Sequence, residues 1–264
     1  MSARPRSFVL TYHSLDAGGS VISTDPSVFR EQMSILARQK ISVVPLGEIR
    51  HRPGAVALTF DDAFASVAEV ALPVLERHGF PATIFAVSGY TGRRNDWPSQ
   101  PSGIPVLPLM SWNDLAEASR RGFEIGAHTV THPKLGSLSL EEAGREMVVS
   151  AAEIREHTGI GPRSFAYPYG DAPAQIRDLA ARHFPICCTT VMGPVTSRTA
   201  ASAITRIDTF YLRSPFWFER LFRAPGRAYL AGRTLLRSVR EFFSEPSRRE
   251  SRKLQIEQQN RTAV

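Results

Sequence analysis

Two groups of side chains that can bind a metal ion follow short apolar segments of this chain. Asp61 and Asp62 come directly after the run AVALTF, and His128 and His132, in the segment HTVTH, come directly after FEIGA. We predict that the apolar runs are buried strands, so that both groups stand at strand ends, where paired side chains can reach one pocket. Imidazoles four residues apart lie on one face of a helical turn and can share a cation. Two nitrogens and one carboxylate leave coordination positions for water and substrate, which is typical of a catalytic metal site.

A third segment that could take part in chemistry is FAYPYG, residues 165–170. Pro168 restricts Tyr167 to an extended or turn conformation, and Gly170 lets a ligand approach the backbone closely. Backbone N–H groups after such a turn can receive an oxyanion. Each segment also has an ordinary interpretation, because an Asp pair can begin a helix, H-x-x-x-H spacing arises by chance, and FAYPYG alone predicts only a turn. The joint occurrence of the three at predicted strand ends favours a site.

The elements that must position these residues alternate along the chain. Segments with helical spacing lie between the predicted strands, and several begin at an N-cap (Asp25, Ser139) or end before a glycine (Gly79, Gly122, Gly159). This alternation indicates parallel strands with right-handed crossovers, and hence a barrel or a doubly wound sheet. The predicted strands are 7–13, 41–46, 55–60, 82–87, 123–128, 163–168 and 185–190, and the predicted helices are 25–40, 65–79, 111–122, 139–159 and 173–183.

The segment 91–111 is long for a loop in a compact domain and contains four prolines and Trp97. Loops of this length serve as lids or binding walls, or extend away from the domain. Trp97 could stack on a sugar ring, or it could pack against the domain.

Length and charge limit the classes of protein to consider. With 264 residues, of which 42% are hydrophobic and 22% charged, the chain is typical of a soluble globular protein with one main domain. The net charge of +7 is confined to one part: residues 211–264 hold 12 of the 32 basic and 5 of the 25 acidic residues, which leaves 20 of each in residues 1–210. A neutral main domain gives little support to nucleic-acid binding.

Cysteine placement and hydropathy bear on the cellular compartment. Cys187 and Cys188 are adjacent in an apolar stretch, which predicts buried free thiols. The first apolar run is too short for a signal peptide, and no stretch approaches the roughly 18 apolar residues of a membrane span. We therefore expect a cytoplasmic protein.

Residues 211–264 are expected to form a basic helical extension to a catalytic domain of residues 1–210. The segment 216–243 is broken by a Pro-Gly pair into two helical pieces, and the second has an apolar face flanked by arginines. Such a helix suits peripheral contact with the anionic inner face of a membrane, and it equally suits docking on the main domain. The polar end of the chain after Pro246 is expected to be disordered.

The segments TFDD, HTVTH and FAYPYG, in this order and with helices between them, resemble the motifs of the polysaccharide deacetylases, the NodB-homology enzymes of carbohydrate esterase family 4. The resemblance covers about residues 8–208, and the FAYPYG form is similar to the branch that includes the poly-N-acetylglucosamine deacetylases. It implies an α/β fold: an irregular (β/α) barrel of about seven strands, circularly permuted, with a C-terminal helical tail. It also implies metal-assisted hydrolysis of N-acetyl groups on amino sugars, as in exopolysaccharide biosynthesis.

By this resemblance, Asp62, His128 and His132 bind a divalent metal ion, zinc. Asp61 is the general base that takes a proton from the attacking water. A carboxylate that binds the metal is neutralised by it, whereas the base must stay free, which explains the pair of neighbouring aspartates. The backbone N–H of Tyr169 helps to hold the tetrahedral oxyanion.

The chain departs from the family pattern at three points. Ala166 replaces the Arg that usually orients the catalytic Asp; Arg206 is a candidate substitute, although a surface ion pair is the commoner role for such a residue. Ala63 replaces the usual Gly, which is a mild change unless the backbone needs a positive φ there. No histidine follows His183 to act as the usual late general acid, and the resemblance to the permuted branch assigns this role to His13. The alternative is that His13 stabilises a strand end by a hydrogen bond.

The resulting prediction is a metal-dependent hydrolase that removes N-acetyl groups from an amino-sugar oligomer or polysaccharide. In a cytoplasmic protein the acceptor could be a lipid-linked intermediate of surface polysaccharide assembly. Two alternatives stay open: a metal amidohydrolase acting on a non-sugar amide, and a carbohydrate-binding pseudoenzyme. The retention of both Asp61 and Asp62 argues against the pseudoenzyme, because a decayed site has no physical need for the pair.

Overall fold

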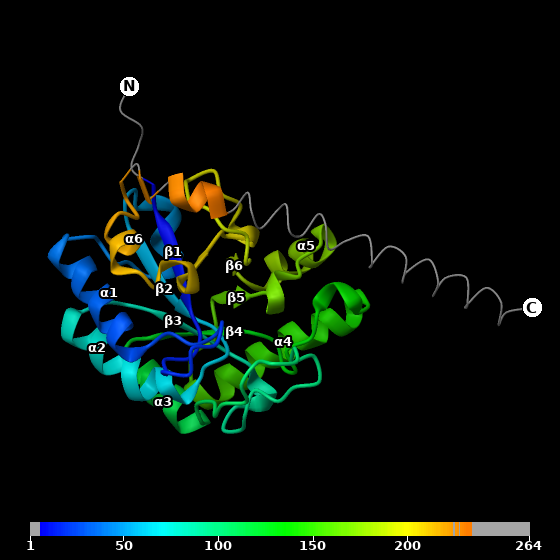
Figure 1. The fold of residues 1–264 in the computed structure, drawn as a ribbon. Helices are drawn as coiled ribbons and strands as arrows, with labels where there is room; N and C mark the ends of the chain where they lie inside the picture. The colour runs from blue at the N-terminus through cyan, green and yellow to red at the C-terminus, as the bar shows by residue number, and fades with distance from the viewer. Residues whose placement is uncertain (1–5, 224, 227, 234–264) are drawn as a thin grey trace, which may run out of the picture.

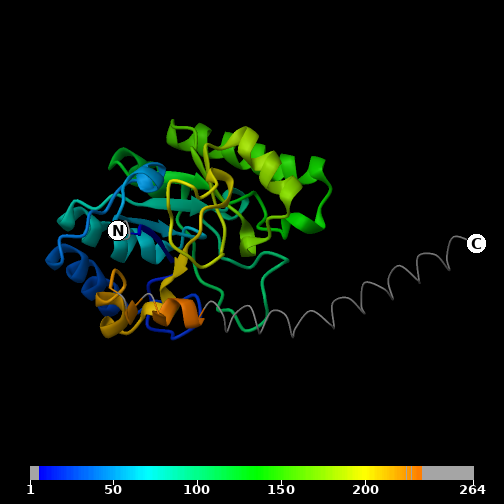
Figure 2. The same cartoon turned by 90° about the horizontal axis from the view of Figure 1, so that it is seen from above.

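The computed structural model describes residues 6–223, 225–226 and 228–233 (Figure 1). Its centre is a sheet of seven parallel strands in the order β6-β5-β4-β3-β2-β1-β7. The sheet curls into a barrel (Figure 2) that is incomplete, because within the described residues no ladder joins β6 to β7, and this confirms the expected fold class. The strands are β1 Phe8–Tyr12, β2 Val56–Phe60, β3 Thr83–Ala86, β4 Glu124–Ala127, β5 Ser164–Ala166, β6 Ile186–Cys188 and β7 Ile207–Asp208.

Six of the seven predicted strands are confirmed, and one is wrong. The run 41–46 forms only an isolated bridge at Val43, because Pro45 has no N–H to donate to a ladder and a 3-10 helix follows, η1 Leu46–His51. The seventh strand is instead β7, which pairs with β1 over two residues. A strand of this length leaves no recognisable period in the sequence.

Helices cover the outer side of the sheet (Figures 1 and 2), and all five predicted helices are confirmed. The Asp25 side chain caps α1, and Ser139 forms a reciprocal capping box with the third residue of α4. Gly79 and Gly159 end α2 and α4 in the left-handed conformation. The helices are α1 Pro26–Arg38, a π-helical turn η2 Val67–Ala71 that leads into α2 Leu72–His78, α3 Trp112–Arg120, α4 Leu140–Thr158, α5 Ala174–His183 and α6 Pro215–Glu219, with 3-10 turns η3 Ser88–Tyr90, η4 Leu135–Ser137, η5 Pro168–Gly170, η6 Ala201–Ala203 and η7 Thr209–Leu212.

Side-chain alternation along the strands decides which residues face the inside of the barrel. The even-numbered residues of β1 and β2 belong to the larger core cluster, which packs against the helices, whereas Val9 and Ala57 belong to a smaller cluster enclosed by the sheet. Counting by twos from Val9 and Ala57 leads to His13 and Asp61, so both side chains face inward at the carboxyl end of the barrel. Small residues in the inner cluster, such as Ala166, leave room for polar side chains.

The described part of the C-terminal extension docks on the barrel. Phe218 and Leu230 are buried, and the rings of Trp217 and Tyr229 stack at 4.4 Å. The Tyr229 hydroxyl donates a hydrogen bond to the carbonyl of Tyr211 at 2.8 Å. The rest of the predicted amphipathic helix lies outside the described residues, and the division of the chain at residue 210 stays a prediction.

Two smaller expectations concern the cysteines and the helix lengths. Cys187 and Cys188 are both free and buried, as predicted. Among the described helices, none combines the length and the apolar character needed to cross a membrane.

Candidate active site

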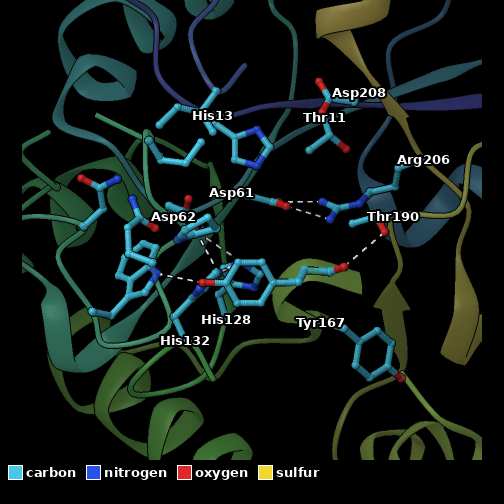
Figure 3. Close-up of a pocket in the computed structure, with 17 residues that line it drawn as sticks. Thr11, His13, Asp61, Asp62, His128, His132, Tyr167, Thr190, Arg206 and Asp208 are labelled. Atoms are coloured by element: carbon cyan, nitrogen blue, oxygen red, sulfur yellow. Dashed lines mark hydrogen bonds and ion pairs between the residues drawn. The ribbon is translucent and has the colours of Figure 1, made fainter. Parts of the chain in front are cut away.

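One cavity of about 270 Å³, at the carboxyl end of the strands, is lined by every predicted site residue (Figure 3). The carboxyl ends of parallel strands meet at one end of a barrel, which brings together segments that are distant in sequence. These segments follow β1, β2, β4 and β5, and their residues are His13, Asp61, Asp62, His128, His132 and Tyr169.

Asp62, His128 and His132 form a compact triangle of donor atoms. The Nε2 atoms of His128 and His132 lie 3.4 Å and 3.3 Å from Asp62 Oδ1, and 3.2 Å from each other. A tetrahedral zinc ion with bonds of about 2.0–2.1 Å needs ligand atoms about 3.3 Å apart. All three side chains are buried, and no described residue donates a hydrogen bond to Asp62 Oδ1. An unsatisfied buried carboxylate oxygen beside two imidazole nitrogens fits a divalent cation, so these residues can hold a metal ion.

Different surroundings keep the two imidazoles available as metal ligands. His128 Nδ1 lies 2.7 Å from the Ala166 carbonyl oxygen, so Nδ1 carries the proton and Nε2 is left as a ligand. Burial lowers the pKa of His132 to about 3, so this ring stays neutral. Burial also acts to lower the pKa of His128, but the neighbouring carboxylates of Asp62 and Asp61 raise it overall. The site therefore attracts positive charge strongly.

The segment 128–132 is not a helical turn, so that part of the prediction is wrong. Thr129 and His132 have φ angles of 69° and 55°, in the left-handed region, and the two imidazoles meet across an irregular loop. Five of the six non-glycine residues with positive φ in the described part of the chain belong to this site. Such conformations cost about 1–3 kcal/mol each and persist only where their surroundings hold them. The other three at the site are Asp62, Ala63 and Tyr169.

Hydrogen bonds to α4 hold the strained histidine loop in place. The Glu146 carboxylate accepts hydrogen bonds from the N–H groups of Val130 at 2.8 Å and Thr131 at 2.9 Å. Thr129 Oγ1 accepts a hydrogen bond from the His132 N–H at 3.0 Å. Sequence reasoning missed Glu146, because its role depends on how α4 packs beside the loop and not on any local spacing.

Ala63 has a φ angle of 54°, in the left-handed region, where an alanine in place of a glycine is costly. An L-residue in this region costs about 1–2 kcal/mol more than glycine. The Ala63 carbonyl accepts a hydrogen bond from the Met110 N–H at 2.8 Å, so the segment 91–111 holds the backbone here. The exception stated for the change from Gly to Ala, a backbone with positive φ, is therefore met, and the change is not a mild one.

Arg206 orients Asp61 through two short hydrogen bonds. Its Nη1 and Nη2 donate to Asp61 Oδ1 and Oδ2 at 2.6 Å and 2.7 Å, and its Nε donates to the Thr189 carbonyl at 2.9 Å. Arg206 is 2% exposed, so the surface ion pair that we considered the commoner role is wrong. Arg206, directly before β7, thus replaces the Arg that the family pattern places at Ala166.

The charges around Asp61 keep it ionised. Burial acts to raise the pKa of Asp61, but the charges of Arg206 and His128 and the hydrogen bonds from Arg206 outweigh burial and hold the pKa well below its usual range. A carboxylate has about four lone-pair sites, so the two bonds to Arg206 leave others for a water molecule.

His13 lines the same cavity as the two aspartates and is partly exposed (Figure 3). Within the part of the chain that the structure describes, its ring forms no hydrogen bond. The alternative role, a hydrogen bond that stabilises the strand end, therefore finds no support.

The segment 91–111 forms one wall of the cavity and contacts both the ring and the backbone carbonyl of His132. The Trp97 ring lies 4.3 Å from the His132 ring, and its Nε1–H donates to the Tyr169 hydroxyl at 3.1 Å. That hydroxyl donates to the Ser99 carbonyl at 2.9 Å, and the Ser99 hydroxyl donates to the His132 carbonyl at 2.6 Å. Trp97 is 2% exposed, so it packs against the domain, and the idea that it stacks on a sugar ring is wrong.

Comparisons with known proteins agree with this architecture. The structure of IcaB from Ammonifex degensii superposes with a TM-score of 0.68 at 22% identity, over 81% of this chain and 97% of that one. The Streptococcus pyogenes deacetylase PplD superposes with a TM-score of 0.67 at 21% identity, over 78% of this chain and 93% of that one. At these identities the likeness shows a shared fold.

Sequence comparison adds the family. A chitin deacetylase of Colletotrichum lindemuthianum is 28% identical over 137 residues, which are 52% of this chain and 50% of the relative. The chain spans half or less of the length of the curated relatives that it matches. The family model described as polysaccharide deacetylase matches residues 48–183, which include both aspartates, both histidines and FAYPYG. Because the matched residues make up more than half of this chain, the chain belongs to the polysaccharide deacetylase family.

Proposed function

We propose that this protein is a metal-dependent N-deacetylase that hydrolyses acetamido groups on an amino-sugar oligomer or polysaccharide. The observation that carries the proposal is the buried triangle of Asp62, His128 and His132 beside the Asp61–Arg206 pair. A metal-ligand set next to a separate, oriented carboxylate is the arrangement that metal-assisted amide hydrolysis requires. The FAYPYG segment suggests poly-N-acetylglucosamine as the first substrate to test.

The proposed metal is a divalent cation, and zinc suits the ligand set. Zinc accepts two imidazole nitrogens and one carboxylate oxygen and leaves a fourth position open in catalytic sites. When bound, such a cation polarises the acetyl carbonyl and makes a water molecule more acidic. The second effect matters here, because Asp61, with its low pKa, is a weak base toward ordinary water.

In the proposed reaction, two different residues of the chain carry out the two proton transfers. Asp61, held by Arg206, accepts a proton from the attacking water, whose oxygen adds to the acetyl carbonyl carbon. The Tyr169 N–H stabilises the oxyanion that forms on the carbonyl oxygen. His13 donates a proton to the amine nitrogen as the C–N bond breaks, and the products are acetate and a free amino sugar.

The test is acetate release from N-acetylglucosamine oligomers by the purified protein. We expect activity to vanish after chelation, to return with zinc, and to fall at least 100-fold in Asp61→Asn and His13→Ala, a loss typical of a missing general base or acid. His183→Ala is the matched control, because His183 is exposed at the end of α5, away from the cavity. A panel of small acetamides separates sugar specificity from general amidohydrolase activity. A protein that binds zinc and oligomers but releases no acetate would instead be the carbohydrate-binding pseudoenzyme.

Membrane contact through residues 216–243, a lipid-linked acceptor and a cytoplasmic location stay predictions. In support of the first, Phe216 is 52% exposed and the Arg220 guanidinium carbon lies 3.6 Å from its ring centroid. Co-sedimentation with anionic vesicles, for the native chain and Phe216→Ser, would test the contact. A Phe216→Ser variant that binds vesicles as tightly as the native chain would remove Phe216 from the proposed interface.

A further inference from the structure

A second cavity, of about 620 Å³, lies at the opposite end of the barrel from the candidate active site. Its lining includes Arg6 and Ser7, which precede β1, whereas Asp61 follows β2. The two strands pair in register over five residues. At about 3.3 Å per residue, roughly 16 Å of strand therefore separates the cavities. One sugar unit cannot occupy both.

The lining of this second cavity is basic. Arg6, Arg50 and Arg198 contribute guanidinium groups and His51 contributes an imidazole, and no Asp or Glu lines the cavity. In the described part of the chain, none of these arginines lies within ion-pair distance of a carboxylate. Residues 1–210 carry equal numbers of acidic and basic residues, so the cluster is a local concentration of charge in a neutral domain.

Arg50 is the most buried of the three arginines, and its donors are poorly satisfied. Its Nε is buried and finds no hydrogen-bond partner among the described residues, and its Nη2 makes only a long contact of 3.4 Å to the Ser197 carbonyl. Arg52, two residues further on, is a useful contrast, because it does not line the cavity and donates to the Glu48 carboxylate at 2.9 Å. The chain therefore provides a partner for one arginine of this segment and leaves the other with unused donors.

Guanidinium groups around one cavity repel one another unless an anion lies between them. Phosphate oxygens are suitable partners, because they accept paired hydrogen bonds from the fork of an arginine and single bonds from hydroxyls such as Thr196, which also lines the cavity. We propose that this cavity binds the phosphate or pyrophosphate group of a phosphate ester. The site is separate from the proposed deacetylase reaction and goes beyond it.

Two sources share this chemistry: the headgroup of an anionic lipid and a soluble nucleoside diphosphate. The C-terminal segment reaches the same end of the barrel, since the Phe222 ring packs edge-on against Phe8, the first residue of β1, with 5.4 Å between the ring centroids. A lipid headgroup would place this end of the molecule on a membrane, with the cavity of Asp61 facing away from it.

Binding of inorganic pyrophosphate to the full, metal-free chain, measured by calorimetry at 150 mM salt, tests the proposal. We expect saturable one-to-one binding that weakens at least tenfold in the double variant Arg50→Gln/Arg198→Gln. The matched control, Arg52→Gln, removes the same charge next to the cavity and should change the dissociation constant less than twofold. Arg198→Gln alone, on an exposed loop, should weaken binding at least threefold and guards against misfolding of the double variant. Absence of saturable binding, or an equal loss in Arg52→Gln, overturns the proposal.

Competition then identifies the source of the phosphate. Displacement of pyrophosphate by phosphatidylglycerol vesicles but not by phosphatidylcholine vesicles assigns a lipid headgroup, and displacement by a nucleoside diphosphate assigns a soluble ester. Displacement by neither overturns a phosphate-ester ligand. Because these measurements need no metal and no acetate release, their failure is distinguishable from failure of the proposed deacetylase activity.

Discussion

The two neighbouring aspartates differ in their environment. Asp62 faces the two imidazoles with one oxygen that no described residue satisfies, whereas both oxygens of Asp61 receive hydrogen bonds from Arg206. One carboxylate is thereby left for a cation and the other is oriented as a base. Alternation along the strand cannot produce this difference, and the positive φ of Asp62, 68°, turns it away from the direction of Asp61.

Loss of Arg206 should change the acidity of Asp61. In Arg206→Met, burial still raises the pKa of Asp61, but less positive charge acts to lower it. We therefore expect the pKa of Asp61 to rise and the protein to lose about 3–5 kcal/mol of stability. In the native protein the pKa of Asp61 is lowered on folding, so the stabilisation by this pair is complete above about pH 4 and is lost as the pH falls. The acid limb of the pH–rate profile for acetate release should therefore move toward neutral pH.

Two further variants make this test specific to Asp61. Arg206→Lys keeps the charge without the planar fork and should fall between the native protein and Arg206→Met. Arg52→Met removes an exposed ion pair and should leave the acid limb unchanged. An acid limb that does not move in Arg206→Met would show that Arg206 does not control Asp61.

Replacing Ala63 should reveal the backbone strain. Ala63→Gly relieves a left-handed alanine at the cost of one buried methyl group and a more flexible unfolded chain, so we expect stability to be unchanged or to rise by up to about 1 kcal/mol. Ala65→Gly is the matched control at a helical position without positive φ, where a loss of about 1 kcal/mol is expected. Urea unfolding of both variants decides the matter, and equal losses would contradict a strained Ala63.

At the scale of elements, three segments meet around His132. The loop 128–132 carries the ligands, Glu146 of α4 holds its amides, and the segment 91–111 supports the far side of the His132 ring. None of these segments would keep its conformation alone, because the loop contains residues in costly left-handed conformations. The geometry of the ligands is therefore a property of the packing of the three.

Loss of the hydrogen bond from Ser99 to His132 should weaken metal binding while the protein stays folded. Ser99→Ala deletes the hydroxyl that donates to the His132 carbonyl, and we expect zinc affinity to fall about tenfold, as for other outer contacts of metal ligands. Competition with a chromogenic chelator measures this directly. Ser102→Ala, at an exposed position of the same segment, should leave the affinity unchanged. Equal affinities in the two variants would mean that the Ser99 contact does not position His132.

At the scale of the whole molecule, the incomplete barrel joins a site at the carboxyl ends of its strands to a basic cavity at their amino ends. The ligands of the proposed metal come from the turn after β2 and from the loop after β4, so a bound cation would link two segments that are far apart in the chain. A ligand that binds only the folded state stabilises it.

We therefore expect the thermal stability of the protein to fall when the metal is removed, and to fall further when the metal-free protein is acidified. Zinc should raise the melting temperature of the chelated protein, and His132→Gln should abolish this rise. Without metal, the low pKa of His132 in the folded state means that the unfolded chain binds a proton that the folded protein excludes, so stability should fall as the pH drops from about 6.5 toward 3, by at most about 1.4 kcal/mol per pH unit.

The contribution of His132 is read from a comparison of two metal-free proteins. His128, whose pKa is raised, acts in the opposite sense and is present in both the native chain and His132→Gln, so the difference between their pH profiles reports His132 together with its coupling to His128. Parallel profiles would contradict a buried, neutral His132.

The sequence by itself determined the alternation of strands and helices, the approximate helix boundaries and six of the residues that line the active-site cavity. These features depend on local rules: apolar period, capping side chains such as Ser139, and the ends of buried runs. The two-residue strand β7 lay beyond such rules, because its pairing with β1 decided it. At 41–46 a local signal against a strand, Pro45, was present in the sequence but was given too little weight.

Only the tertiary structure decided which distant groups meet. Arg206 and Asp61 are 145 positions apart, and no local pattern tells a buried bidentate pair from a surface one. The positive φ of Ala63, the burial of Trp97 against His132 and the basic cavity of Arg6, Arg50 and Arg198 are likewise consequences of packing. The physical reason is that burial and charge pairing depend on the neighbours that the fold supplies, whereas sequence spacing reports only on neighbours along the chain.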